Sequence, residues 1–383
     1  MTLNDITVVP LDSDSGSEVT VHLGDGSSSH QWIRSDHPLV SSAEDLTPWM
    51  FALLPLAMTL GTRLVLKGSV DAMGLSGVST VQTVFAGWYP EKMRQVPVVT
   101  DSTHTSTATE GSASFFSGGV DSFYTLSSAV PPLDSIVYAG GFDIPWADTD
   151  RLDRAWATTQ MAAAEFSARP IRVNVNIADL TNPHTHFGYV QHGASIAAIA
   201  NALRNSIGDV LIASSYVDEQ LHPWGTHPDL DYLWSTSGQS IKHDRTTETR
   251  ADKVAALKDS RSFRRGLCVC WRSPLGNCGT CEKCVRTRIN LRATGNDGIC
   301  ETLPPLDLAD LARLTLSEPA ERLFAEETLK YIRAADLQDL ELERALVAAI
   351  ARGVRRVRIS KIARSTVLKL PGASSVVDKI LRR

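Results

Sequence analysis

The string Ser117-Gly118-Gly119-Val120-Asp121-Ser122 decides the expected fold, because it stands between an apolar run (residues 112–116) and a helix-like stretch (residues 123–129). Two adjacent glycines let the backbone turn tightly and approach a ligand without a Cβ in the way. The following helix would point unpaired N–H groups and the positive end of its dipole at the same place. Ser117 and Ser122 add hydroxyl donors, and Asp121 would hold Mg²⁺ or position a phosphate-bound water. The pattern predicts a cradle for pyrophosphate or a nucleoside triphosphate.

The simpler interpretation of this string is a glycine turn in a βα unit, with Ser122 capping the helix. It is not a Walker loop, because no Gly-Lys-Ser/Thr follows the glycines. It resembles instead the pyrophosphate-binding loop of the N-type ATP pyrophosphatases (the PP-loop superfamily), which adenylate a carbonyl or carboxylate and release pyrophosphate. The resemblance implies that residues 117–122 bind the phosphates of ATP, with catalytic roles for Ser117, Asp121 and Ser122.

The pattern on both sides of the string predicts an α/β fold with a parallel sheet. Apolar strands alternate with amphipathic helices, which indicates a sheet covered on both faces. The expected strands are residues 112–116, 135–139, 171–175 and 210–213, and the expected helices are residues 121–128, 151–167 and 189–206. Ligands of such sheets collect beyond the carboxyl ends of the strands. The expected site is therefore made by residues 117–122, 140–145 and 214–219 and by the neighbourhood of Asn176.

The rest of the chain is expected to form three further units. Residues 1–111 predict an N-terminal α+β domain that ends in a polar linker (residues 100–111), and the nucleotide-binding domain covers residues 112–260. Within the first unit we expect strands at residues 18–23, 31–33 and 63–66 and helices at residues 43–60 and 78–85. A four-cysteine knob would occupy residues 261–300, and residues 301–383 predict a helical region with a basic tail.

All six cysteines lie between Cys268 and Cys300. Four of them have the spacing C-x7-C-x2-C-x2-C, which suits four thiolates around a tetrahedral Zn²⁺ ion; they are Cys270, Cys278, Cys281 and Cys284. Cys268 competes with Cys270 for the first position, and Cys300 is expected in the core. A redox pair, a thiol sulfur carrier and an iron–sulfur ligand set are the alternatives.

The loop followed by the cysteine motif resembles the 7-cyano-7-deazaguanine synthase group of the same superfamily, over residues 112–293. This resemblance implies a Rossmann-like fold of the adenine nucleotide alpha hydrolase type, with ATP on the loop and zinc on the four cysteines. It implies an ATP-dependent ligase, in which a small carboxylate is adenylated, ammonia or an amine attacks, and AMP and pyrophosphate are released. The chain departs from that group in its N-terminal hundred residues, its helical tail and the loop after the fourth strand.

Further residues of the α/β unit are candidates for nucleotide binding. Gly141 and Asp143 follow the second strand, where superfamily members seat adenosine, although Asp143 also suits an ordinary loop. His192 lies early in a helix and is otherwise a capping or packed residue. Lys242 or Lys253 would neutralise the triphosphate, whereas helix-surface salt bridges explain Lys253 equally well.

The polar stretch 214–231 is expected to recognise the acceptor or to bind a second metal. Its candidate residues are Tyr216, Asp218, Glu219 and His227. The alternative is a surface loop that happens to be polar.

Composition narrows the functional classes. The chain has 383 residues, 43% of them hydrophobic, and a formal net charge of -5, which argues against a general nucleic-acid binder. No signal peptide or membrane span is expected, and clustered cysteines suit a reducing cytoplasm. The basic tail would contact tRNA, a partner protein or a membrane surface, or would simply be a solvated face, and a homodimer is compatible with the sequence. A tRNA-modifying or thiolating enzyme and a non-catalytic nucleotide sensor or scaffold are the alternative functions.

Overall fold

A single ten-stranded, mostly parallel sheet organises this α/β protein. The computed structural model describes residues 5–13, 16–270, 272–273, 275–314, 316, 318–335 and 339–367. The strand order is β10-β9-β6-β7-β8-β3-β2-β1-β4-β5. The strands are β1 (Ile6–Leu11), β2 (Gly16–His22), β3 (Ser28–Ser35), β4 (Leu64–Asp71), β5 (Val98–His104), β6 (Ser112–Phe115), β7 (Ser135–Gly140), β8 (Arg169–Val175), β9 (Asp209–Ile212) and β10 (Ser240–His243).

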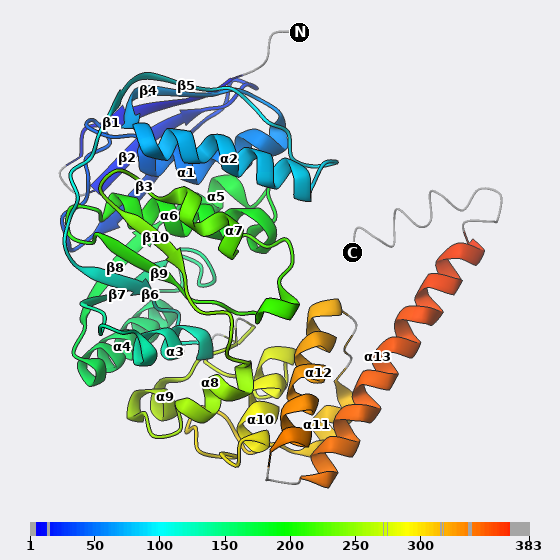
Figure 1. Ribbon diagram of the computed structural model, residues 1–383. Coiled ribbons are helices and arrows are strands. Elements are labelled where there is room, and N and C mark those ends of the chain that lie inside the picture. Colours follow the sequence, from blue (N-terminus) through cyan, green and yellow to red (C-terminus); the bar gives the residue numbers. More distant parts are fainter. Residues whose placement is uncertain are drawn as a thin grey trace.

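Helices cover both faces of this sheet, and further helices form a separate layer below it (Figure 1). The helices before β10 are α1 (Thr47–Leu60), α2 (Ala72–Trp88), α3 (Val120–Ser128), α4 (Thr149–Phe166), α5 (Ile177–Thr181), the π-helix η1 (Phe187–Gln191), α6 (His192–Ala202), the 3₁₀ turns η2 (Asp218–Gln220) and η3 (Tyr232–Trp234), and α7 (Pro228–Asp231). The later ones are α8 (Arg250–Ala256), α9 (Arg261–Gly266), α10 (Glu282–Ala293), α11 (Leu308–Arg313), α12 (Pro319–Ala334) and α13 (Leu340–Val367).

The parallel half of the sheet follows the expected βα alternation. Strands β10, β9, β6, β7 and β8 pair in parallel, and the expected strands and helices of this half are present, with boundaries shifted by a few residues. The expected helix at residues 189–206 begins as the π-helix η1 and continues as α6. The strand β10 was not predicted, because its sequence Ser-Ile-Lys-His has a single apolar residue and so forms no apolar run.

The N-terminal strands do not form a sheet of their own. β3 pairs with β8 in antiparallel fashion and so joins β1, β2, β4 and β5 to the parallel half. The stretch expected as a linker, residues 100–111, contains most of β5, which pairs with β4. Its polar residues are compatible with a strand because β5 lies at the edge of the sheet, with only one neighbouring strand.

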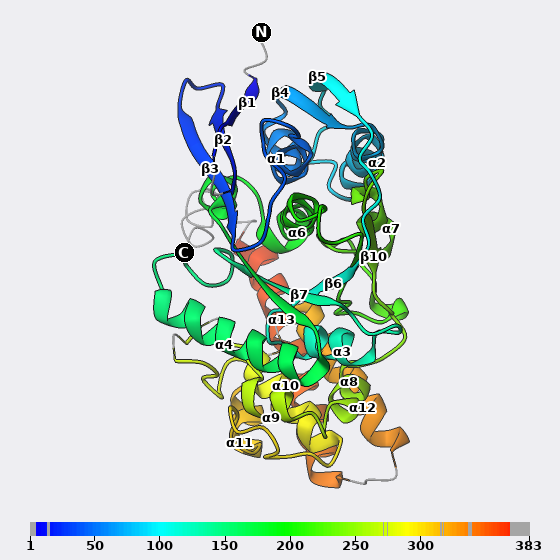
Figure 2. The ribbon, with the colours of Figure 1, turned by 90° about the vertical axis from the view of Figure 1, so that its left-hand side faces the viewer.

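The helix α1 is the centre of the upper core. Twelve of its residues are buried, as expected for a helix that is apolar on all sides, and it packs against α6. Gly61 ends it in a left-handed conformation (φ 66°). Figure 2 shows the strands curving around α1 and α6, whereas α3 and α4 lie on the outer face.

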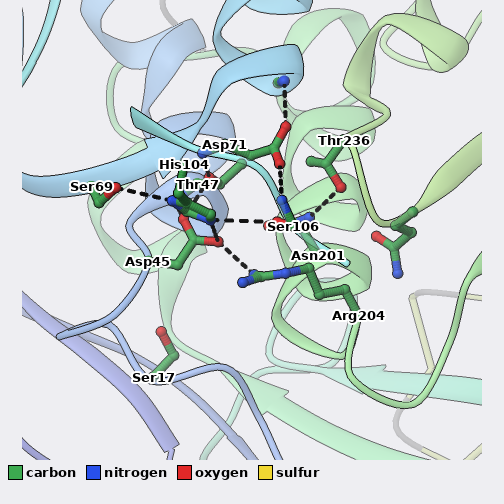
Figure 3. Close-up of polar contacts among 12 residues, drawn as sticks. Ser17, Asp45, Thr47, Ser69, Asp71, His104, Ser106, Asn201, Arg204 and Thr236 are labelled. Atoms are coloured by element: carbon green, nitrogen blue, oxygen red, sulfur yellow. Dashed lines mark hydrogen bonds and ion pairs between the residues drawn. The ribbon is translucent and has the colours of Figure 1, made fainter. Parts of the chain in front are cut away.

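A buried polar network fastens the N-terminal half to the rest (Figure 3). Asp45, just before α1, lies 2.5 Å from Arg204 beyond α6 and 3.3 Å from His104 at the end of β5. Asp71, at the end of β4, accepts hydrogen bonds from the backbone N–H groups of Ser106 and Ser237. These contacts join segments on both sides of residue 111.

The C-terminal helices α10 to α13 pack on one another around a separate small core. The last of them, α13, projects away from the body in Figure 1. Residues 368–383 of the expected basic tail lie outside the described residues. Within the described ranges, no helix is both long and apolar enough to cross a membrane.

Candidate functional site

The loop of residues 117–122 lies where the order of the parallel strands reverses. It follows β6, whose two neighbours are β7 and β9, so crossovers leave β6 in opposite directions. A crevice forms at the carboxyl ends of the strands at such a point, and ligands of open α/β sheets bind there. The loop is thus in the one region of the parallel half where this topology favours a ligand.

The local geometry of the loop agrees with an anion cradle. Gly118 has φ 74°, a conformation that favours glycine, and Gly119 is the residue before the first turn of α3. The hydroxyl of Ser122 donates to the carbonyl of Gly119 (3.0 Å) and lies 3.3 Å from the backbone nitrogen of Ser117. The backbone N–H of Cys268 donates a hydrogen bond to the carbonyl of Gly118 (2.8 Å), which ties the loop to the segment after α9.

Asp121 holds two buried cations at the loop. Its Oδ2 lies 2.9 Å from Arg250 Nη1, and its Oδ1 lies 3.2 Å from Lys253 Nζ. Burial alone would raise the pKa of Asp121, but the charges of Arg250 and Lys253 hold that pKa well below its usual range. Lys253 Nζ also donates to the carbonyl of Ser214 (2.6 Å). Two cations share one carboxylate here, so this triad carries a net positive charge.

Asp121 does not fit the expected role of a magnesium ligand in this arrangement. Both of its oxygens are engaged by Arg250 and Lys253, and Ser215 Oγ lies 3.3 Å from Oδ2. A magnesium ligand needs a carboxylate oxygen that faces the ion. The positive charge offered to a bound anion therefore comes from side chains of α8.

The helix α10 adds two more cations, Lys283 and Arg286, to this region. The guanidinium carbon of Arg286 lies 4.1 Å from the ring centroid of Phe324, and burial, together with the charge of Arg250, lowers the pKa of Arg286. Burial, with the charge of Arg286, also lowers the pKa of Lys283 to about 8. The cationic region therefore extends from α8 to the helix that begins at the cysteines, and Glu282, whose Oε1 lies 3.4 Å from Arg286 Nε, offsets part of its charge.

The helix α12, in the C-terminal region, holds the start of α8 and so helps to position Arg250. The buried carboxylate of Glu327 accepts a hydrogen bond from the backbone N–H of Arg250 (2.8 Å) and one from Gln220 Nε2 (2.7 Å). Burial raises the pKa of Glu327. The first turn of α8 is thus tied to a segment more than seventy residues further along the chain.

An aromatic wall stands beside the cations. It consists of Tyr89, Tyr189, Tyr216, His222, Trp224 and Phe324, whose neighbouring ring centroids are 4.5 to 6.4 Å apart. Tyr216 stacks on Phe324 (5.4 Å, interplanar angle 19°). The hydroxyl of Tyr89 donates to the carbonyl of Pro223 (2.8 Å), so the N-terminal half contributes to this wall. Planar surfaces of this kind suit a ligand with a flat ring.

The predicted nucleotide residues are only partly brought together. Gly141 (φ 104°) lies so close to the carbonyl of Val175 that a Cβ would not fit there. Asp143 is exposed, and its charge raises the pKa of Lys283 against the effect of burial. His192 lies between Gly188 and Thr226, next to Phe187 and Trp224, and burial lowers its pKa to about 4. It is therefore a packed, neutral histidine.

Lys242 lies away from the loop. Its Nζ pairs with Asp209 (3.0 Å), which begins β9 at the opposite, amino edge of the sheet, and both side chains are more than half exposed. Lys253, which the sequence left open between phosphate binding and a surface salt bridge, is the lysine that reaches the loop.

The structure brings only some of the residues predicted to bind the acceptor close to the loop. Tyr216 belongs to the aromatic wall, and Asp218 accepts a hydrogen bond from Thr246, which joins the loops after β9 and β10. Glu219 is exposed. His227 is buried against Trp88 and donates its backbone N–H to Asp231, on the α7 side.

The four predicted cysteines form one cluster. Their sulfur atoms all lie within 4.8 Å of one another, with Cys270–Cys281 at 3.8 Å and Cys278–Cys284 at 3.9 Å. A tetrahedral ion with Zn–S bonds of about 2.3 Å places its sulfurs about 3.8 Å apart, so the cluster can hold a metal such as zinc. Cys268 is not part of it.

The knuckle around the cluster is shaped by two local features. Gly279 has φ 76°, and the backbone N–H of Cys281 points at Cys278 Sγ (3.2 Å). Asn277 Oδ1 accepts from the backbone N–H groups of Val269 and Cys270 (2.8 and 3.2 Å). Cys281 precedes α10 and Cys284 lies in its first turn, so the cluster sets the direction of the helix that carries Lys283 and Arg286.

Sequence reasoning missed Lys283, Arg286, Phe324 and Glu327, and it gave Arg250, three residues before Lys253, no role of its own. Lys283 and Arg286 carry a local signal, since they flank the last cysteine of the motif. Phe324 and Glu327 have none, because only packing brings α12 to the loop.

Comparisons with protein-family models, with curated proteins and with solved structures found no match for this chain.

Proposed function

We propose that this protein is an ATP-dependent ligase, which binds the phosphates of ATP on residues 117–122 and adenylates a small carboxylate. The observation that carries the proposal is the convergence of Arg250 and Lys253 on Asp121 of a glycine loop at the point where the strand order reverses. The order β8-β7-β6-β9-β10 supports the proposal, because five parallel strands of a Rossmann-like nucleotide-binding sheet follow the same order.

The proposed chemistry needs little more than charge and position. An oxygen of the acceptor carboxylate attacks the α-phosphorus of ATP, and the bond to pyrophosphate breaks, which gives an acyl adenylate. Ammonia or an amine then attacks the acyl carbon, and AMP leaves. The loop, Arg250 and Lys253 balance the charge of the departing pyrophosphate, and Tyr216 and its aromatic neighbours hold the acceptor. Zinc on the four cysteines would be structural, since all four ligand positions are protein thiolates.

The products of ATP test this proposal. The protein is incubated with ATP, magnesium, ammonium and a panel of small carboxylates labelled with heavy oxygen, and products are separated by chromatography and mass spectrometry. We expect acceptor-dependent AMP and pyrophosphate, with one heavy oxygen transferred to AMP. ADP and phosphate as the products, or nucleotide binding without turnover for every acid, would leave a kinase-like enzyme or a nucleotide sensor instead.

A thiolating enzyme is the second candidate function. The position of Cys268 favours it. This cysteine is outside the metal cluster and lies directly against Gly118 of the loop. In this alternative a sulfane-sulfur donor places a persulfide on Cys268, whose terminal sulfur attacks the adenylated carbon of the acceptor while AMP leaves. A thiol reductant then cleaves the resulting disulfide between Cys268 and the acceptor, which releases the thiolated acceptor and leaves the reductant in a mixed disulfide with Cys268, and a second equivalent of the thiol frees the cysteine. Mass spectrometry of the protein after exposure to a sulfur donor should then find the persulfide at Cys268, and Cys268→Ser should abolish turnover.

A further inference from the structure

A basic hollow on the surface is not used by the proposed chemistry. It has a volume of about 320 Å³ and is lined by Arg261, Arg264, Arg265, Ile299 and Glu301. We call it the arginine hollow. Its arginines come from the short helix α9, which Figure 1 shows beside α8 and below α4.

The backbone around the arginine hollow is firmly held. Glu165 of α4 accepts hydrogen bonds from the backbone N–H groups of Arg261 (2.8 Å) and Ser262 (2.5 Å), so its charge is directed at the start of α9 and not at the arginine side chains. The backbone N–H of Glu301 donates to the carbonyl of Arg264 (2.8 Å). The two walls of the hollow are therefore joined to each other and to the sheet's outer helix.

The charge of the arginine hollow is not balanced within it. Three guanidinium groups face one carboxylate, and in the part of the chain that the structure describes only Arg265 has an acidic partner, Glu301 at 3.6 Å. That pair is weak, because its two side chains are 46% and 68% exposed. An anionic ligand would neutralise the remaining positive charge.

We propose that the arginine hollow binds phosphate groups, either those of a polynucleotide backbone or those of a small phosphate such as pyrophosphate. Guanidinium groups present planar pairs of N–H donors that match phosphate oxygens. Among the described residues, the lining has no aromatic ring on which a base would stack, so recognition rests on phosphate and not on sequence. The net charge of -5 limits such binding to a local surface.

The test compares two doubly substituted full-length proteins with equal changes of charge. Arg261→Gln/Arg264→Gln alters the hollow, and Lys92→Gln/Arg94→Gln alters exposed residues of the N-terminal half. Binding of a fluorescein-labelled single-stranded oligoribonucleotide is followed by anisotropy over a range of salt concentrations. We expect the hollow variant to bind about tenfold more weakly and its salt dependence to fall by about 1.4 in log–log slope, with the control unchanged.

A second arm identifies the source of the phosphate. Inorganic pyrophosphate is titrated calorimetrically into the Lys253→Ala protein, in which the loop is weakened, with and without the hollow substitutions. Pyrophosphate binding that depends on Arg261 and Arg264, without RNA binding, supports a small phosphate as the ligand. If the hollow substitutions leave the binding of both probes unchanged, the proposal is overturned. Arg261→Gln alone, at an exposed position, repeats the comparison should the double variant be unstable.

Discussion

Lys253 Nζ lies 3.2 Å from Asp121 Oδ1, although the two residues are 132 positions apart in the chain. Asp121 is in the first turn of α3, and Lys253 is buried on α8. The carboxylate holds the lysine, and with it Arg250, next to the glycine loop. Their combined positive charge is what the proposed pyrophosphate-releasing reaction requires at this place.

Removal of this lysine should weaken nucleotide binding. We expect Lys253→Ala to raise the Kd for ATP by about 30-fold or more, because a buried partner of a charge pair is worth about 2 kcal/mol or more on binding. Isothermal titration calorimetry measures it. Lys242→Ala is the matched control, since Lys242 pairs with Asp209 at the far edge of the sheet and should leave the Kd unchanged. Equal losses in both variants would refute the assignment.

The carboxylate of Glu327 should matter for the geometry of Arg250. In Glu327→Gln the buried carboxylate that accepts from the Arg250 N–H and from Gln220 Nε2 becomes a neutral amide with one acceptor oxygen. The negative charge beside Arg250 is lost, and Gln220 must turn its amide to stay hydrogen-bonded. We expect unfolding free energy to fall by about 1–3 kcal/mol and ATP affinity to fall with it. Urea denaturation and calorimetry test this. Glu326→Gln, at the exposed position next to Glu327, is the control. A similar loss of stability and affinity in that variant would argue against a specific role for α12.

Metal content tests the cysteine cluster. Purified protein should contain one equivalent of zinc, and Cys278→Ser or Cys284→Ser should lose it and destabilise α10, because structural zinc binding is coupled to folding. Cys268→Ser should keep the metal, since Cys268 is outside the cluster. Elemental analysis and thermal unfolding give the readouts. Zinc loss in the Cys268 variant would instead place that residue among the ligands.

Burial of His192 predicts a pH dependence of stability. Its pKa falls from 6.5 to about 4 on folding, so the unfolded chain takes up a proton between these values and the folded chain does not. Stability therefore decreases as pH falls from 6.5 to 4, by up to about 3 kcal/mol from this residue. His192→Gln removes this dependence. Guanidinium denaturation at several pH values should show a steeper loss for the wild type, and parallel curves would contradict the assignment.

The ion pair between Asp45 and Arg204 should stabilise the contact between the N-terminal half and the parallel half of the sheet. Asp45 is 1% exposed, and Asp45→Ala leaves Arg204 buried without its carboxylate (Figure 3), which should cost about 3–5 kcal/mol of unfolding free energy. Asp209→Ala breaks an exposed pair and should cost less than about 1 kcal/mol. Chemical denaturation distinguishes them. A small effect at Asp45 would show that the halves are held mainly by the strand pairing of β3 with β8.

Sequence alone determined the parts of this protein that are encoded within a few consecutive residues. The glycines before α3 specify a turn through their own φ freedom, and the cysteines of the motif meet because a tight knuckle and one helical turn bring Cys278, Cys281 and Cys284 to one point. The alternation of apolar strands and amphipathic helices likewise gave the parallel half of the sheet, since burial on two faces leaves a continuous apolar run.

Tertiary structure alone decided which charges surround the loop and how the halves join. Lys242 and Lys253 carry the same local signal, and only the packing of α8 on α3 brings Lys253 to Asp121 while Lys242 faces the other edge. Glu327 and Phe324 reach the site because α12 packs on α8 and α10. The pairing of β3 with β8 has the same origin: it is a hydrogen-bonded contact between distant segments, whose register no short stretch of sequence records.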